Sequence, residues 1–291
     1  MQLVRRLCSL WLVVGLSACT WHVREDNIVI PRAAPSADLA ALRAQLPAYR
    51  IEETRIAADG AQLYALRFLR RDALATVLYF GGNGYTVARH AATSAKAYAD
   101  APVNFVLVDH RGYGASTGTA SLEALLADAG TVYERLRQDP ELAGLPLIVH
   151  GHSLGSFMAG RVAATHRLDG VILESSVTRF EDWGAHMRSR QKRWARLLVR
   201  RVAPAGALVG QGNLAVVQAL DEPVLFVAGE NDLATPPRFA QALYEATPQP
   251  EGRKRLLIVP GRHHANATDS PEFRQALAAF LAEAVRPQPA G

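Results

Sequence analysis

The sequence contains little cysteine and little lysine. Its two cysteines, Cys8 and Cys19, both lie within the first twenty of 291 residues. A disulfide framework or a cysteine-ligated metal site is therefore excluded for the rest of the chain. Only three of the 32 basic residues are lysines, and the net charge of +5 is too small to indicate nucleic-acid binding. With 49% hydrophobic residues, the composition predicts a globular domain with a sizeable core.

The N-terminal residues have the pattern of a targeting segment. Two arginines precede an apolar stretch over residues 7–15, which is too short for a permanent membrane span. The stretch continues into the sequence LSAC at 16–19, which resembles the lipobox of bacterial lipoproteins, where the cysteine is diacylated. We predict a lipoprotein signal peptide over residues 1–18 and a lipid anchor on Cys19. The alternative is a plain secretory signal that is cut after Ala18.

The lipobox resemblance also implies a location. Thr20, rather than an aspartate, follows the cysteine, which in lipoproteins implies no retention in the inner membrane. We therefore expect the protein at the bacterial outer membrane, facing the periplasm. Residues 19–49 hold three prolines and many small residues and are predicted to be a tether. No repeat or low-complexity block divides the rest, so one domain is predicted over residues 50–286.

Eight apolar or alternating runs predict the strands of this domain. They cover residues 50–56, 62–69, 76–80, 104–109, 146–150, 170–174, 223–228 and 255–259. Amphipathic stretches with helical spacing separate most of them. Such alternation is typical of the α/β class, with a mostly parallel eight-stranded sheet and helices on both faces. The first two runs are joined at Asp59-Gly60, which favours an antiparallel hairpin at the sheet edge.

The sequence GHSLG at 151–155 matches the pattern G-x-S-x-G. In this pattern a serine sits on a sharp turn between a strand and a helix, and the glycines leave room for the strand and helix to approach. A predicted strand precedes the motif here and a helical pattern follows it. Ser153 is therefore the candidate nucleophile. The alternative, a glycine-rich turn of a nucleotide-binding protein, is disfavoured because no G-x-G-x-x-G or Walker sequence accompanies it.

A serine hydroxyl needs a base to take its proton and an acid to orient that base. Asp232 lies just after the predicted strand at 223–228, and the pair His263-His264 lies just after the strand at 255–259. The order serine, aspartate, histidine and the placement at strand carboxyl ends predict a catalytic triad. The alternative is an ordinary turn aspartate and two solvated histidines.

Attack on an acyl carbon also needs two donors for the oxyanion. We expect one donor to be the backbone N–H of Leu154, directly after the nucleophile. The other is expected from the loop GGNG at 81–84, after the strand at 76–80, with the N–H of Asn83 favoured and that of Gly82 as the alternative.

These residues resemble the α/β-hydrolase superfamily, and the resemblance covers nearly all of residues 50–286. The likeness is to the BEM46/ABHD13-like lineage of serine hydrolases, which carries an H-G-N segment and a D-x-R-G-x-G-x-S signature. The signature stands intact as DHRGYGAS at 109–116, whereas Gly81 replaces the histidine of the H-G-N segment. We interpret Asp109 as structural rather than catalytic. The P-G-x-x-H pattern of related hydrolases, at 260–264, favours His264 over His263 as the base.

The resemblance implies an α/β-hydrolase fold with a small helical cap inserted at about 175–222. Together with the lipobox, it implies a lipid-anchored serine hydrolase acting through an acyl-enzyme, with carboxylic esters, esters of the acylglycerol or lysophospholipid type among them, as first choice of substrate. No metal or organic cofactor is implied. A peptidase or amidase of the same fold is the runner-up, because the same triad serves both reactions. A non-catalytic envelope binding protein is the alternative from another class.

The predicted cap contains a strongly basic stretch. Residues 186–201 hold seven arginines and lysines, no acidic residue, and Trp194 among several aliphatic side chains. We predict a helix here. It either contacts the membrane surface or packs as a cap helix with a solvated basic face, and the sequence leaves both interpretations open.

Overall fold

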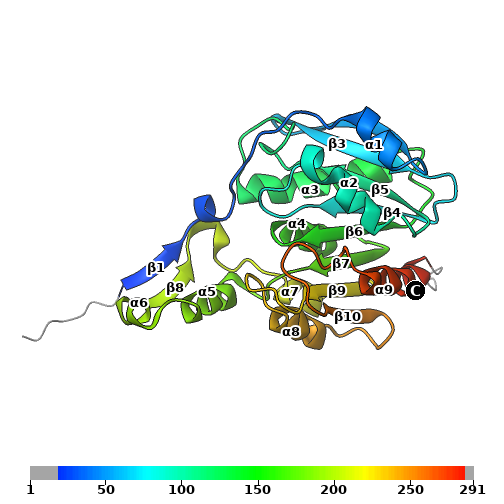
Figure 1. Ribbon diagram of the computed structural model, residues 1–291. Helices are drawn as coiled ribbons and strands as arrows, with labels where there is room; N and C mark the ends of the chain where they lie inside the picture. The colour runs from blue at the N-terminus through cyan, green and yellow to red at the C-terminus, as the bar shows by residue number, and fades with distance from the viewer. Residues whose placement is uncertain (1–18, 286–291) are drawn as a thin grey trace, which may run out of the picture.

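The computed structural model describes residues 19–285, so the predicted signal peptide over 1–18 lies outside the described residues (Figure 1). The centre of the molecule is an eight-stranded sheet. Its strands, in spatial order, are β2 (Arg50–Ala58), β3 (Ala61–Leu69), β5 (Val103–Val108), β4 (Ala75–Phe80), β6 (Leu147–His152), β7 (Gly170–Glu174), β9 (Val224–Gly229) and β10 (Lys254–Val259). All neighbours are parallel except β2 with β3 and β3 with β5. The predicted α/β class and the antiparallel edge hairpin are confirmed.

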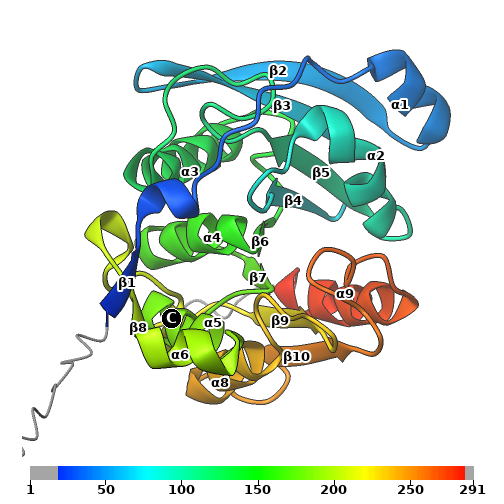
Figure 2. The ribbon, with the colours of Figure 1, turned by 60° about the vertical axis from the view of Figure 1, so that its left-hand side comes forward.

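Helices cover both faces of the sheet, as predicted (Figure 2). The helices of the main body are α1 (Leu39–Gln45), α2 (Val87–Ala97), α3 (Leu122–Arg137), α4 (Leu154–Thr165), α7 (Leu214–Gln218), α8 (Arg238–Ala246) and α9 (Pro271–Ala284). Buried residues of α3, α4, α7 and α8 form one hydrophobic cluster, and those of α1, α2 and α9 form a second. Within β4, Leu78 belongs to the first cluster and Val77 to the second, because successive strand side chains point to opposite faces.

A small second sheet extends from this body as an arm (Figures 1 and 2). In it β1 (Cys19–Val23) pairs in parallel with β8 (Val199–Pro204), next to α5 (Phe180–Ser189) and α6 (Arg193–Leu198). The backbone of α5 lies so close to β8 that a Cβ at Gly184 would stand 2.4 Å from the carbonyl oxygen of Val202. The arm therefore joins the start of the described chain to the predicted cap region.

The arm corrects the prediction of one continuous basic helix over 186–201. This stretch is divided between the end of α5, the short α6 and the start of β8. Val199 and Val202 pair with β1, and β-branched residues suit a strand better than a helix. Strand pairing over a long sequence distance outweighs the local helical pattern here.

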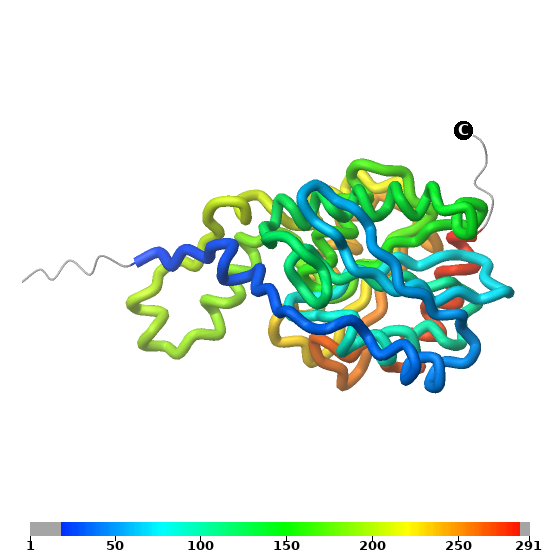
Figure 3. Tube along the Cα trace, turned by 90° about the horizontal axis from the view of Figure 1, so that it is seen from above, coloured from blue at the N-terminus to red at the C-terminus, as the bar shows by residue number. Residues whose placement is uncertain are grey.

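The prediction of a tether over residues 19–49 also needs correction, because the segment packs against the domain (Figure 3). After β1 come the short helix η1 (Glu25–Asn27) and then α1. Val23 and Val29 are buried, and the backbone N–H of Ala37 donates to the hydroxyl of Tyr64 at 3.0 Å. The segment contains prolines, which favoured a tether, but its buried apolar side chains attach it to the surface of the domain.

Across residues 19–285, every helix is too short or too polar to serve as a transmembrane segment.

Candidate active site

Ser153 occupies the turn between β6 and α4. Its backbone has a φ of +52°, a left-handed conformation that is rare for any residue other than glycine. A Cβ at Gly155 would lie 2.0 Å from the carbonyl oxygen of Phe80, and one at Gly151 would lie 2.2 Å from that of Gly155. The two glycines are therefore required for the strand and helix to meet, and the predicted strand, turn and helix around the serine is confirmed.

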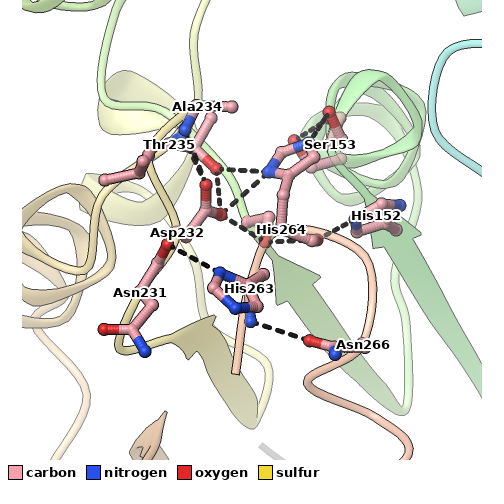
Figure 4. Close-up of polar contacts among 12 residues, drawn as sticks. His152, Ser153, Asn231, Asp232, Ala234, Thr235, His263, His264 and Asn266 are labelled. Atoms are coloured by element: carbon pink, nitrogen blue, oxygen red, sulfur yellow. Dashed lines mark hydrogen bonds and ion pairs between the residues drawn. The ribbon is translucent and has the colours of Figure 1, made fainter. Parts of the chain in front are cut away.

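Three side chains from distant parts of the sequence form a hydrogen-bonded chain at this turn (Figure 4). Nε2 of His264 lies 2.9 Å from Oγ of Ser153, and Nδ1 of His264 lies 2.8 Å from Oδ2 of Asp232. Because the carboxylate accepts, Nδ1 is the protonated nitrogen, and Nε2 is left to accept the serine proton. The structure thus brings together Ser153, His264 and Asp232, as the sequence predicted.

His263, the alternative base, and Glu230, an acidic residue two positions before Asp232, both point elsewhere. His263 is exposed, with Nδ1 3.3 Å from the carbonyl oxygen of Asn231, and its backbone N–H donates to Asn266 (Figure 4). Glu230 accepts a hydrogen bond from the backbone N–H of Gly261 at 2.8 Å. Neither side chain contacts Ser153, so the geometry favours His264 and Asp232.

Asp232 is buried and surrounded by donors. Its Oδ1 accepts from the backbone N–H groups of Ala234 and Thr235 at 2.8 and 2.9 Å, and its Oδ2 accepts from the Thr235 hydroxyl at 2.7 Å. Burial alone would raise the pKa of Asp232, but the hydrogen bond from His264 and those from Thr235 outweigh it and lower the pKa to about 2. The carboxylate is therefore ionised at neutral pH and can orient the imidazole.

Sequence reasoning missed two contacts around the histidine. Ser175, directly after β7 and also at a positive φ of 50°, donates to Oδ2 of Asp232 at 3.0 Å and lies 3.2 Å from the carbonyl oxygen of His264. His152 contacts that same carbonyl oxygen through Nε2 at 2.7 Å. The signal for Ser175 was its position at a strand carboxyl end, on the same sheet edge as the other site residues.

The loop at 81–84 lies directly against the serine turn. A Cβ at Gly82 would stand 2.8 Å from Nδ1 of His152 and 3.3 Å from the Cβ of Ser153, so only glycine allows this approach. The Oδ1 atom of Asn83 accepts from the backbone N–H of Ile30 at 3.2 Å and from the hydroxyl of Tyr113 at 3.0 Å. These two bonds fix the loop in position beside the first turn of α4, where backbone N–H groups have no partner within the helix.

The departure at Gly81 also has a structural reason. A Cβ at this position would stand 2.2 Å from the ring of Tyr85, which is buried against the loop. The space that a histidine would need is occupied by this tyrosine.

Side chains of the 109–116 motif stabilise the loops beside the site through hydrogen bonds and an ion pair. Asp109 accepts from the backbone N–H groups of Val87 at 2.6 Å and Ala115 at 2.9 Å, and burial raises its pKa to about 6. Arg111 forms a two-bond ion pair with Asp128, at 2.6 and 2.9 Å. None of these contacts involves Ser153, which supports the interpretation of Asp109 as structural.

A pocket of about 170 Å³ opens beside Ser153 and His264. Its walls are mostly apolar, and the rings of Phe157 and Phe180 stack with centroids 5.0 Å apart. The pocket is lined by Asn27, Ile28, Asn83, Ser153, Leu154, Phe157, Ser175, Val177, Phe180, Trp183, Ala234, Thr235 and His264. The N-terminal segment therefore contributes part of the wall, through η1 and the residue after it. Within residues 19–285, no cluster of three histidine, cysteine or acidic side chains could hold a metal ion.

The fold and the hydrogen-bonded serine, histidine and aspartate together define a hydrolase of the α/β-hydrolase class. The serine aminopeptidase S33 family model matches residues 71–212, and the TAP-like protein model matches residues 210–290. An esterase of Pyrococcus furiosus superposes with a TM-score of 0.68 at 15% identity, over 88% of this chain and 97% of the esterase. This likeness shows the shared fold.

Curated relatives narrow the class further. Protein bem46 of Schizosaccharomyces pombe is 26% identical over 72% of this chain and 67% of its own length. Human ABHD12B is 27% identical over 73% of this chain and 62% of its own length. An uncharacterized membrane protein of Saccharomyces cerevisiae is 26% identical over 79% of this chain and 78% of its own length. The chain belongs to the BEM46/ABHD-like lineage of the α/β hydrolases.

Proposed function

We propose that the protein is a lipid-anchored serine hydrolase that cleaves carboxylic esters through an acyl-enzyme intermediate. The observation that carries this proposal is the continuous chain of hydrogen bonds from Ser153 through His264 to Asp232, at 2.9 and 2.8 Å. In this arrangement the serine is the nucleophile, the histidine is the general base, and the carboxylate orients the imidazole and stabilises its charged form.

The reaction proceeds in two halves. Oγ of Ser153 attacks the ester carbonyl carbon while its proton passes to Nε2 of His264, and the N–H groups of Leu154 and Asn83 stabilise the resulting oxyanion. The bond to the leaving alcohol then breaks as the alcohol oxygen takes the proton from His264. Water, deprotonated by the same nitrogen, then attacks the acyl carbon. The bond from that carbon to Oγ of Ser153 breaks, the carboxylic acid leaves, and Oγ takes the proton back from His264.

The pocket supports an ester with an apolar group near the carbonyl. A volume of about 170 Å³ is close to that of a cavity that holds one benzene molecule. It fits a short acyl group or the first carbons of a longer one, which agrees with acylglycerol or lysophospholipid esters as well as small esters. Phe157, Phe180 and Trp183 would supply the apolar contacts.

Amide hydrolysis is the second candidate, because the family model that matches residues 71–212 is described as a serine aminopeptidase. A panel of p-nitrophenyl esters against aminoacyl p-nitroanilides separates the two. We expect the esters to be cleaved with the higher kcat/KM. Faster cleavage of an anilide would transfer the assignment to the peptidase.

Labelling with a fluorophosphonate probe tests the serine mechanism. The parent chain should be labelled, and Ser153→Ala should lose both labelling and ester turnover while its circular dichroism spectrum is unchanged. Ser156→Ala is a matched control, because Ser156 lies one turn away in α4 and donates to the carbonyl oxygen of Ser153 rather than facing the pocket. Labelling that persists in Ser153→Ala would end the proposal.

The lipid anchor has its own test. Cys19 is exposed at the outer end of β1, where an attached diacylglycerol would meet no obstruction from the core. Full-length protein expressed in a bacterial host should incorporate a labelled fatty acid and fractionate with the outer membrane, and Cys19→Ser should incorporate no labelled fatty acid. Equal incorporation by both chains would exclude the anchor at this residue.

A further inference from the structure

Large apolar side chains are exposed together at the end of the arm. We call this surface the tip and define it by Trp21 of β1 and Trp194, Leu197 and Leu198 of α6. Their exposed fractions are 50%, 63%, 74% and 50%. Across residues 19–285 there are eight exposed large hydrophobic residues, and half of them belong to these two elements of the arm. Concentrated apolar exposure of this kind marks an interaction site.

Strand pairing places Cys19 at the same tip. In the ladder between β1 and β8, Cys19 is opposite Val199, which directly follows Leu197 and Leu198. The two segments are far apart in the sequence and lie side by side only through this pairing (Figures 1 and 3). The residue that resembles a lipidation site and the exposed apolar side chains thus occupy the same end of the molecule.

The tip is also strongly basic. Six basic residues lie in or beside α6 and at the start of β8: Arg190, Lys192, Arg193, Arg196, Arg200 and Arg201. All but Arg196 are exposed, and the stretch from 190 to 201 contains no acidic residue. In the part of the chain from 19 to 285, none of the six takes part in an ion pair. Their charge is therefore available to an anionic partner.

We propose that the tip is a docking surface for an anionic lipid bilayer, with its tryptophans and leucines in the interfacial region and its basic residues against lipid phosphates. Exposed aromatic and aliphatic side chains rimmed by cations are the composition that such surfaces bind. A second copy of the chain is a poor occupant, because each tip would present six like charges to the other. The proposal shares its membrane location with the proposed function but does not depend on acylation of Cys19.

Docking would also orient the active site. β1 runs from the tip towards the body and leads into η1, whose Asn27 lines the pocket together with Ile28. Five strand residues span roughly 17 Å. The pocket would therefore stand close above the bilayer, where amphiphilic esters are concentrated, and lipid-derived esters become its substrate class.

Vesicle binding by the chain from residue 19 onward, which contains every described element, tests the proposal. The chain carries Cys19→Ser, so that no lipid can be attached. We expect it to sediment with vesicles of phosphatidylcholine and phosphatidylglycerol and not with phosphatidylcholine alone, and added salt should weaken the binding by screening. Because the readout is sedimentation, it is unaffected if the protein proves not to be a serine hydrolase.

Two sets of variants identify the surface. The charge variant combines Arg193→Gln, Arg200→Gln and Arg201→Gln. Its control combines three exposed arginines of the main body, one in α3, one in α4 and one just after α4: Arg135→Gln, Arg161→Gln and Arg167→Gln. At about 1 kcal/mol for each cation, the charge variant should bind about 100-fold more weakly and the control within about threefold of the parent. The apolar variant Leu197→Ser with Leu198→Ser should also lose binding, whereas Leu74→Ser, another exposed leucine, should not.

Three results would overturn the proposal. These are no sedimentation of the parent chain with the mixed vesicles, an equal loss in the arginine control, or full binding by the apolar variant. Thermal unfolding of every variant by circular dichroism shows that each is folded, so that loss of binding reports the surface and not the fold.

Discussion

The carbonyl oxygen of His264 lies 2.7 Å from Nε2 of His152, the residue immediately before the proposed nucleophile. Because a carbonyl can only accept, Nε2 of His152 carries a proton. Burial lowers the pKa of His152, which keeps its ring neutral and leaves Nδ1 unprotonated against Gly82. The turn that presents the serine thus also holds the backbone of the base, so the distance between the two reacting groups is fixed from both sides.

This relationship predicts a positioning role for His152. His152→Phe retains a ring but removes the donor, and we expect kcat on a soluble ester to fall about tenfold or more with little change in KM. His152→Gln, which can donate from its amide, should recover part of the loss. Equal kcat in the phenylalanine variant and the parent would show that the hydrogen bond has no part in positioning His264.

The two adjacent histidines should differ sharply. His264→Ala removes the proposed base and should lower kcat by about 10³ or more. His263→Ala removes a side chain that faces Asn231 at the surface, and activity should stay within a few-fold of the parent. Steady-state turnover of a p-nitrophenyl ester measures both. The reverse ranking would transfer the role of base to His263.

Asp232→Asn should be nearly as severe as loss of the base. An amide in place of the carboxylate no longer stabilises the charged imidazole, and it can present a donor to Nδ1, which favours the wrong tautomer; a loss of about 10³ to 10⁴ in kcat is expected. Glu230→Gln is the matched control, since Glu230 contacts Gly261 and not His264. Activity that survives in Asp232→Asn but not in Glu230→Gln would identify Glu230 as the orienting acid.

The raised pKa of Asp109 should be visible in the pH dependence of the free energy of unfolding. Burial raises the pKa of Asp109 from 3.8 to about 6, so between about pH 4 and 6 the folded chain holds a proton that the unfolded chain has released. Its contribution to the free energy of unfolding therefore falls as pH rises through this range. Urea unfolding should show that Asp109→Asn removes this part of the slope.

Asp232 supplies the control for that experiment. Its pKa of about 2 lies below the ordinary value, so its stabilisation is complete above about pH 4 and is lost only as pH falls towards 2. Asp232→Asn should leave the slope between pH 4 and 6 unchanged. An unchanged slope in Asp109→Asn would mean that the Asp109 carboxylate titrates near its ordinary pKa despite burial.

Ile28 should limit the length of the acyl group. It is half-buried and lines the pocket opposite residues of the main body, and truncation removes three carbons from the wall. We expect Ile28→Ala to raise kcat/KM for longer acyl chains relative to acetyl esters several-fold. Ile30→Ala is the control, because Ile30 is 44% exposed, does not line the pocket, and donates to Asn83 through its backbone N–H, which the substitution keeps. Identical chain-length profiles for the two variants would remove Ile28 from the determinants of specificity.

The elements that the sequence predicted best are those with a strong local signal. All eight strands of the central sheet were predicted to within two residues, because each is a short apolar or alternating run. Ser153, Asp232 and His264 could be placed together because parallel strands end at one edge of the sheet. The sequence held no such local signal for the arm, because the arm depends on the pairing of Cys19 with Val199, which are far apart in the sequence.

Ser175 shows a second limit of prediction. A serine after a strand is common, and its hydrogen bond to Asp232 depends on β7 lying next to β9 in the sheet. The strand order could not be derived from the runs alone. The prediction of one helix over 186–201 failed for a similar reason. The helical pattern of this stretch was overridden by the pairing of Val199 and Val202 with β1.

The parallel ladder between β1 and β8 has a consequence for how the protein is made. Cys19 and Val199 are separated by about 180 residues, and closing so long a loop is entropically costly and slow. During synthesis, residues 19–23 leave the ribosome long before their partner strand exists. We therefore expect the arm to assemble last. Until then the first strand is an extended, accessible segment, so the proposed cleavage and lipidation at Cys19 would take place before β1 pairs with β8.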